Sequence, residues 1–292
     1  MVRTHNATKR QKVAESALFT PDVVFLVGSL LDARDLCRVS RMCKTLGAKR
    51  ASAFDGLSMV EEAARRLFEC ASDCERSCLP KYHDEGWIEL YHHLLMLRSK
   101  LTFDQLVGFN IQYGDDQSIV ETPAFGSISP SSALCSNHVM RSGRHFVFVM
   151  RHWGILYRIV VRPVQINRSD FDVGELRSFY PGAPSFREYL IGQRTNRWSD
   201  SNVHCCNVSL FTGKSYWYDW ASPQPEVRVV GGFQSNTPFG LLLDLDEGTL
   251  SAYQNGQRLA TLKDGLSGEY CWYASLIDNV IISIERGLAS EG

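Results

Sequence analysis

The stretch Leu243–Leu262, LDLDEGTLSAYQNGQRLATL, decides the fold. Apolar and polar residues alternate in it, and the alternation is interrupted by Glu247-Gly248 and by Asn255-Gly256. A period of two residues is typical of strands with one buried face. Asn-Gly favours a two-residue hairpin, because both central positions of a type I′ turn need a positive φ. The stretch therefore predicts consecutive antiparallel strands whose core side chains are Leu243, Leu245 and Leu250.

The same strand-like pattern begins at about Phe109 and continues to the end of the chain. The segments richest in β-branched and aromatic residues are Arg144–Met150, Tyr157–Val161, Leu241–Leu245, Thr249–Tyr253, Arg258–Leu262 and Val280–Ile284. Many short strands joined by Gly-rich turns predict an antiparallel β-sandwich. A polar insertion, Gln165–Thr195, interrupts the middle of this region.

The first third of the chain has helical periodicity, so the predicted fold class is α+β. Thr20 suits an N-cap, Pro21 suits the first helical position, and Asp32 is placed to cap a second helix. The apolar residues that mark four helices are Val23, Val24, Val27, Leu30 and Leu31; Leu36, Val39, Met42 and Cys43; Leu57, Val60, Ala64, Leu67 and Phe68; and Trp87, Leu90, Tyr91, Leu94, Leu95 and Leu101.

Composition excludes several classes of function. The formal net charge of -1 over 292 residues gives no overall attraction to nucleic acid or to an anionic membrane. The longest apolar run, 23–31, is too short to span a bilayer, and no signal peptide is recognisable. Nine Cys without a disulfide-framework spacing fit a reducing compartment, so we expect a cytoplasmic or nuclear protein. No phosphate loop, nucleophile elbow or zinc-protease motif occurs, and no cofactor is expected.

The segment Phe239–Leu276 resembles the C-terminal half of a SPRY domain, whose pattern has an "I-G-x-x-L-D-L-D-x-G-x-L-S-F-Y-x-N-G" run and a "G-L-x-G" tail. Upstream, Ser142–Phe146 resembles the family's "S-G-K-H-Y" strand entry, and Gly213–Trp220 resembles its aromatic middle strand. Trp272-Tyr273 departs from the family's Tyr-Pro. The resemblance implies a bent β-sandwich that binds peptide segments of other proteins through loops at one end and is not an enzyme.

The segment Thr20–Leu46, TPDVVFLVGSLLDARDLCRVSRMCKTL, resembles an F-box. Thr20 stands where the family has Leu, and Leu46 falls near the expected Trp. The resemblance implies binding to the Skp-type adaptor of a cullin ubiquitin ligase through Pro21, Val24, Val27, Leu30, Leu31, Leu36, Val39 and Met42. The alternative is a helical subdomain that packs only on its own chain.

Together these resemblances predict a basic disordered tail over 1–16, an F-box-like unit over 17–56, a helical linker over 57–107 and a SPRY β-sandwich over 108–288. The corresponding function is that of a substrate receptor in a Skp–cullin–F-box ligase, which binds an unknown target protein through the sandwich. A scaffold that recruits no ligase is the first alternative. A sugar-binding or hydrolytic sandwich is the second.

Aromatic residues beside arginines predict the target-binding surface, because Trp, Tyr and Arg dominate interface hot spots. The alternative is ordinary core packing, which large aromatics also favour. Strand alternation should place Tyr216 and Tyr218 on one face and Trp217 on the other, and should separate Cys205 from Cys206. The predicted target-binding residues are Arg194, Arg197, Trp198, Tyr216, Tyr218, Ile277 and Asp278.

Cys70, Cys74 and Cys78 follow one another at steps of four, which predicts one shared helix face. A structural zinc site is one interpretation, although its usual Cys spacing is two to four residues with a second pair elsewhere. The other interpretation, small apolar residues in a helical core, is the one we favour.

Overall fold

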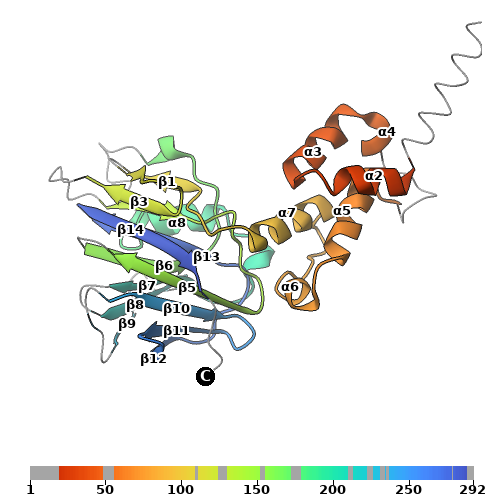
Figure 1. Cartoon of the computed structure of the whole chain (residues 1–292). Coiled ribbons are helices and arrows are strands. Elements are labelled where there is room, and N and C mark those ends of the chain that lie inside the picture. Colours follow the sequence, from red (N-terminus) through yellow and green to blue (C-terminus); the bar gives the residue numbers. More distant parts are fainter. Residues whose placement is uncertain are drawn as a thin grey trace, which may run out of the picture. The chain divides into compact units, whose positions relative to one another are not determined.

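The computed structural model describes residues 20–48, 56–108, 111–123, 130–151, 155–171, 179–209, 213–221, 226–230, 234, 237–277 and 279–287. The chain divides into two compact units, Met1–Ser99 and Lys100–Gly292 (Figure 1). The second unit thus starts earlier than residue 108, where the sequence placed the boundary. The predicted tail over 1–16 lies outside the described residues. No helix in the described ranges combines the length and apolar character needed to cross a membrane.

The first unit, here called the helical unit, is built from short helices. Their bounds in the described residues are α2 (Pro21–Gly28), α3 (Ala33–Met42), α4 (Lys44–Gly47), α5 (Met59–Glu69), α6 (Asp73–Ser77) and α7 (Trp87–Arg98).

Polar side chains at the N-termini explain where these helices begin. The Asp32 carboxylate accepts the Asp35 N–H at 2.8 Å, which confirms the predicted cap of α3. Thr20 occupies the N-cap position of α2 as predicted, but its side chain makes no capping hydrogen bond. The backbone N–H of Trp87, at the start of α7, donates to the Glu61 carboxylate on α5 at 2.6 Å. This bond ties two helices that are distant in sequence.

The first helix is shorter than predicted. It ends at Gly28, so Leu30 and Leu31 follow it instead of extending its stripe. Their backbone N–H groups donate to the carbonyls of Val27 and Gly28 at 3.1 and 3.0 Å, which tightens the last turn before Asp32 starts the next helix.

The core of the helical unit joins α3, α5 and α7. Leu36, Val60, Ala64, Leu90 and Leu94 are buried together in it. A smaller group, Val24, Met59 and Ala63, attaches α2 to α5. The segment predicted as a linker, 57–107, therefore supplies α5 and α7 to the core of the same unit as the F-box-like helices, instead of acting as a separate spacer.

The three cysteines Cys70, Cys74 and Cys78 do not share a helix face, so that expectation was wrong. Helix α5 ends at Glu69, and Ser72 starts α6 with a capping box whose second member is Glu75. Cys70 and Cys74 are exposed and Cys78 is half-buried, so none of them is a fully buried core residue. All nine cysteines of the chain are free thiols.

The second unit, here called the sandwich, contains two seven-stranded antiparallel sheets. Sheet A has the order β1-β4-β13-β6-β7-β8-β9, and sheet B the order β12-β11-β10-β5-β14-β3-β2. The strands are β1 (Gln105–Val107), β2 (Gln112–Tyr113), β3 (Ile119–Thr122), β4 (Ser131–Leu134), β5 (Arg144–Arg151), β6 (Ile155–Val161), β7 (Val203–Ser209), β8 (Lys214–Asp219), β9 (Glu226–Val229), β10 (Phe239–Asp244), β11 (Thr249–Gln254), β12 (Gln257–Lys263), β13 (Cys271–Ile277) and β14 (Val280–Arg286).

The opening stretch folds as predicted. Strands β10 and β11 pair with Leu243 opposite Leu250, and both side chains are buried in the core between the sheets. Leu245 is partly buried against the same core. Asn255 and Gly256 have φ values of 54° and 75°, which confirms the tight hairpin between β11 and β12.

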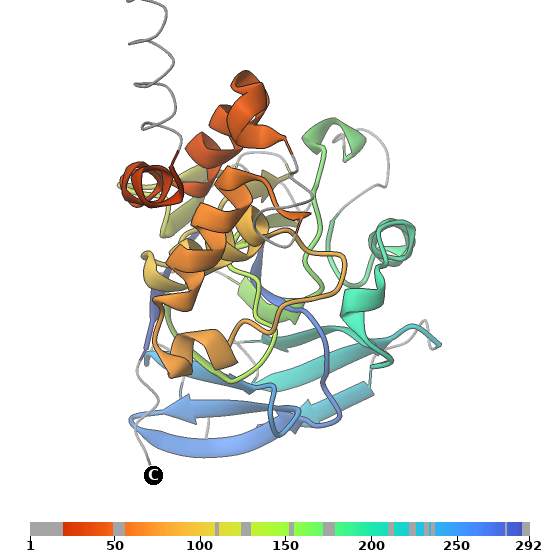
Figure 2. The ribbon, with the colours of Figure 1, turned by 90° about the vertical axis from the view of Figure 1, so that its right-hand side faces the viewer.

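Sheet A is covered on both faces. Its inner face packs against sheet B in the main core, and its outer face packs against a second aromatic core formed with the described parts of the insertion, 165–171 and 179–195. These parts contain the short 3-10 helix η2 (Arg168–Asp170) and helix α8 (Pro184–Gly192), and a second 3-10 helix, η3 (Asn196–Trp198), directly follows the insertion. Figure 2 shows α8 nearly end-on, in blue-green, beside the strands.

The adjacent residues Cys205 and Cys206 confirm that β7 separates the two cores. Cys205 lies in the outer core and Cys206 in the main core. Burial raises the pKa of both thiols, that of Cys206 to about 12. A strand whose two faces are both apolar is expected where a sheet lies between two layers.

Candidate functional site

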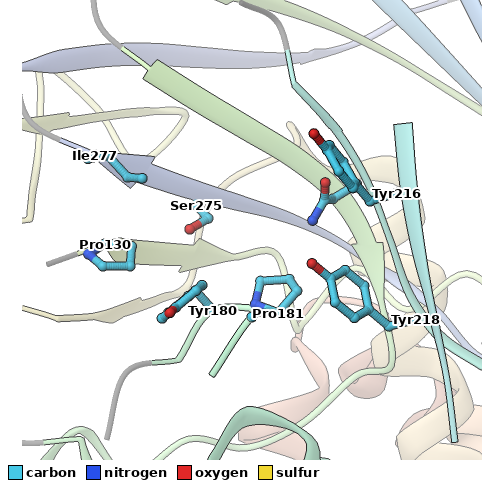
Figure 3. A pocket seen from close by; sticks show the side chains of 9 residues that line it. Pro130, Tyr180, Pro181, Tyr216, Tyr218, Ser275 and Ile277 are labelled. Atoms are coloured by element: carbon cyan, nitrogen blue, oxygen red, sulfur yellow. The ribbon is translucent and has the colours of Figure 1, made fainter. Parts of the chain in front are cut away.

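The outer face of sheet A contains a pocket of about 260 Å³ (Figure 3). Its lining comes from the start of β4, from β7, β8 and β13, and from the turn before α8. The lining residues are Pro130, Tyr180, Pro181, Gly182, Asn207, Tyr216, Tyr218, Ser275 and Ile277.

Strand alternation places the two tyrosines of β8 on one face of the strand and Trp217 on the other, as the sequence predicted, and the face with the tyrosines carries the pocket. Tyr216 and Tyr218 are half-buried and line it, whereas Trp217 points to the other face and is buried in the main core. Figure 3 shows the two tyrosines on one side of the pocket, with Pro130, Tyr180 and Ile277 on the other.

The opposite wall depends on a turn in the insertion. The Ala183 N–H donates to the Tyr180 carbonyl at 2.9 Å, which closes a turn with Pro181 at its second position. Just before it, Phe179 is buried, and its carbonyl accepts a hydrogen bond from the Tyr273 hydroxyl at 2.8 Å and another from Ser132. Buried strand side chains of sheet A therefore hold the turn in place.

Aromatic packing anchors the same segment. The Phe179 ring lies 4.7 Å from Phe186 of α8 and 5.9 Å from Tyr273, measured between ring centroids. Burial raises the pKa of the Tyr273 hydroxyl well above its usual value, so it remains a hydrogen-bond donor at any physiological pH. The pocket wall thus rests on a packed, neutral layer.

Asn207 is the most deeply buried amide of the pocket. It lies on β7 opposite Tyr216 in the strand register, with 4% of its surface exposed. Among the described residues its Oδ1 has no hydrogen-bond partner. An unpaired polar atom in a buried position costs about 1–3 kcal/mol, which makes this amide a place where a ligand gains affinity.

Three of the predicted target-binding residues lie outside this pocket. Trp198 is 2% exposed and stacks on Trp220 at 6.0 Å with an interplanar angle of 7°, so its prediction as a surface residue was wrong. The backbone explains the burial: a Cβ on Gly268, whose φ is +77°, would come within 2.5 Å of the Trp198 carbonyl. The backbones of Gly268 and Trp198 therefore pack closely, and the Trp198 indole is buried in the outer core.

Arg194 and Arg197 belong to the same corner as Trp198. The Arg194 guanidinium lies 5.2 Å from the centre of the Trp220 ring, a cation–π geometry. The Arg197 carbonyl accepts the Glu269 N–H at 3.1 Å. Asp278 lies outside the described residues. The pocket therefore unites Tyr216, Tyr218 and Ile277 of the predicted set.

Sequence reasoning missed the other walls of the pocket. Tyr180-Pro181-Gly182 is a recognisable turn sequence, but nothing in the sequence shows that it folds onto β8. Asn207 could be found only from the pairing of β7 with β8, which places it beside Tyr216.

The predicted adaptor-binding residues also separate into two groups. Leu36 and Val24 are buried in the helical unit, and Leu31 and Val39 are packed against its core. Of Pro21 the structure describes only the backbone. Val27, Leu30 and Met42 are exposed to 52%, 85% and 86%, and the neighbouring Leu26, absent from the prediction, to 63%. We call Leu26, Val27, Leu30 and Met42 the exposed apolar set.

A group with metal-type donors occurs elsewhere in the helical unit. One ligand atom from each of Glu85, Glu89 and His93 lies within 4.8 Å of the others. Such groups are common without an ion, and no role follows from this one alone.

Comparison with known proteins gives no match to a protein-family model and none to a curated protein. Among solved structures, the PSpry domain of TRIM65 is 14% identical over 65% of this chain and 92% of that one, with a TM-score of 0.42. The SPRY domain of human HERC1 is 13% identical over 62% and 98%, with a TM-score of 0.38. The carbohydrate-binding module CBM66 from Bacillus subtilis is 8% identical over 63% and 96%, with a TM-score of 0.33. With TM-scores below 0.5, these similarities carry no functional conclusion.

Proposed function

We propose that this chain is a substrate receptor of a Skp–cullin–F-box ubiquitin ligase, with a SPRY-type sandwich that binds the target protein. The observation that carries the proposal is the exposed apolar set at the end of α2 and α3. A Leu or Met side chain that is more than four-fifths exposed in a packed unit loses the free energy that burial would give, about 1.5–3 kcal/mol each.

Placement within the chain supports docking through these residues. Of the seven large apolar residues exposed in the described part of the chain, four belong to the exposed apolar set: Leu26, Val27, Leu30 and Met42. They fall inside the segment with the F-box resemblance, Thr20–Leu46. Val24 and Leu36 are buried in the core of the helical unit, so α2 and α3 can pack within the unit and still present a second, exposed surface to an adaptor.

The role of the chain in such a ligase is to position a target. The sandwich would hold the target and the helical unit would hold the ligase, which raises the effective concentration of the target near the ubiquitin-loaded enzyme. No bond chemistry is assigned to the chain itself.

The test is co-purification of the full chain with a Skp-type adaptor, read by size-exclusion chromatography. We expect a one-to-one complex for the unaltered chain and none for Val27→Asp combined with Leu30→Asp. Both side chains are exposed, so the helical unit should keep its fold, which circular dichroism checks.

The matched control is Ile191→Asp, because Ile191 is 45% exposed on α8 of the sandwich and should not affect the adaptor. A complex that survives the double change would place the adaptor elsewhere. If the unaltered chain forms no complex with the adaptor, the proposed ligase role is excluded.

A scaffold without ligase recruitment is favoured by one observation. Leu46, which falls near the position where the F-box pattern has Trp, is partly buried against both apolar clusters of the helical unit. An absence of the adaptor complex would leave this alternative as the better account.

A further inference from the structure

The pocket on sheet A has a chemistry that restricts its ligand. Its nine described lining residues include three tyrosines, two prolines and one isoleucine, and none of these nine is charged. A charged ligand group entering such a pocket would lose its hydration without gaining an opposite charge. The occupant must therefore be uncharged where it is buried.

The volume restricts the size of the occupant. At about 260 Å³ the pocket is smaller than the roughly 300–1,000 Å³ of sites that enclose whole drug-sized ligands. It has room for a few side chains of a chain that continues outside. A segment of a polypeptide satisfies this better than a free cofactor does.

Hydrogen-bonding capacity restricts the ligand further. Two of the lining side chains are both polar and buried, those of Ser275 and Asn207. The Oδ1 of Asn207 lacks a hydrogen-bond partner in the described residues. A half-turn of the amide exchanges Oδ1 and Nδ2, so this residue can offer either an acceptor or a donor to the pocket.

From these features we infer that the pocket receives an uncharged, proline-containing segment of the target in an extended polyproline II conformation. Proline has no N–H to lose from water on burial, so it fits a pocket with one free amide better than other residues do. Aromatic-lined grooves recognise such segments because the polyproline II helix is already ordered before binding. A neighbouring non-proline residue would supply the one N–H that Asn207 can accept.

A sugar fits the same lining less well. Nearly every carbon of a sugar carries a hydroxyl, and each hydroxyl that is buried requires a partner. The pocket offers the Asn207 amide and the tyrosine hydroxyls at its walls. The inference rests on the proposed role of the sandwich as the target-binding unit, but it does not depend on the adaptor.

The experiment is isothermal titration of the full chain with three probes. The first is the capped peptide GPPAPPAPG, the second is GSSASSASG, in which Ser replaces every Pro, and the third is maltohexaose. We expect saturable binding of the first peptide only. Replacing both alanines of the proline peptide with glutamate should weaken binding, because none of the nine described lining residues is a cation that could pair with the new charges.

Variants connect binding to the pocket. Tyr218→Ala should weaken the proline peptide at least tenfold, which corresponds to about 1.4 kcal/mol, whereas Tyr218→Phe keeps the ring and should stay within about threefold. Ile277→Glu, at the end of β13, brings a charge to the pocket wall and should likewise weaken binding of the proline peptide at least tenfold. Ile191→Ala on α8 is the control that should change nothing. Thermal melting verifies that each variant is folded.

Each outcome decides the matter. Binding of the proline peptide that is lost in Tyr218→Ala and Ile277→Glu supports the inference. Preference for maltohexaose, equal binding of the serine peptide, or no binding at all overturns it. If the peptide result overturns the inference but the same preparation still forms the adaptor complex, the proposed ligase role stands and only the inference about the pocket fails. If the proline peptide binds but no adaptor complex forms, the inference about the pocket stands and the proposed ligase role fails.

Discussion

Sheet A of the sandwich is covered by apolar residues on both faces, whereas α2 and α3 of the helical unit leave Leu26, Val27, Leu30 and Met42 exposed. In the sandwich, residues from the described parts of the insertion, 165–171 and 179–195, pack on the outer face. The helical unit has two small apolar clusters and no further layer of its own among the described residues. Under the proposed function, the sandwich would bind its target through a pocket in an otherwise covered sheet face, and the helical unit would bind a second protein through the exposed apolar set.

The largest loss of stability should come from removing a buried side chain of the outer core of the sandwich. Trp198→Ala removes a buried indole from the outer core and should lower the free energy of unfolding of the sandwich by about 3–5 kcal/mol. Urea denaturation followed by far-ultraviolet circular dichroism measures it. The control Ile191→Ala, at an exposed site, should change stability by at most about 0.5 kcal/mol. A Trp198→Ala protein as stable as the control would mean that the indole is not packed as described.

The next effect compares a covered and an uncovered leucine within the helical unit. Leu36 is 2% exposed and Leu30 is 85% exposed. Leu36→Ala should cost about 2–5 kcal/mol, and Leu30→Ala less than about 0.5 kcal/mol. Thermal melting of the full chain, with the helical signal followed separately, checks this difference. Equal losses would show that Leu30 is also covered and would weaken the adaptor proposal.

A smaller effect should appear when the sandwich is acidified. Burial lowers the pKa of His145 to about 4 and that of His204 to about 3. Both values lie below the unfolded value of about 6.5, so on acidification the unfolded chain binds protons first. The contribution of these two neutral histidines to the free energy of unfolding is therefore fully present above about pH 6.5. It decreases as the pH falls, by about 2 kcal/mol per histidine between pH 7 and pH 5.

Urea midpoints at pH 7 and pH 5 measure this loss. His204→Phe removes one titrating ring from a site already lined by Phe186 and Trp220, and it should reduce the pH dependence by about half. An unchanged dependence would mean that His204 is not held neutral by burial.

The sequence predicted the sandwich because its signals are local. Asn255-Gly256 favours a tight turn through its own backbone preferences, and the alternation around it places Leu243 and Leu250 on one face of the hairpin. The cap at Asp32 and the division of Cys205 from Cys206 follow from equally local rules.

Features that depend on distant packing could not be predicted in this way. Helical spacing gives Leu30 and Leu36 the same apolar character, but only the positions of α5 and α7 decide which one is covered. Trp198 looked like a surface hot spot because nothing in its neighbourhood shows that Trp220 stacks on it. The pocket combines Tyr218 with Tyr180, which are brought together only by the aromatic core beneath the insertion.

The distribution of thiols has a practical consequence. Cys70 and Cys74 are exposed on the helical unit, whereas Cys135, Cys205, Cys206 and Cys271 of the sandwich are buried with raised pKa values. The thiolate is the nucleophile that attacks an alkylating reagent, so a maleimide fluorophore should react with the exposed thiols of the helical unit first and leave the buried thiols of the sandwich unlabelled. The natural chain thus carries its own attachment points for a dye, from which energy transfer to a labelled partner could report docking without any engineered cysteine.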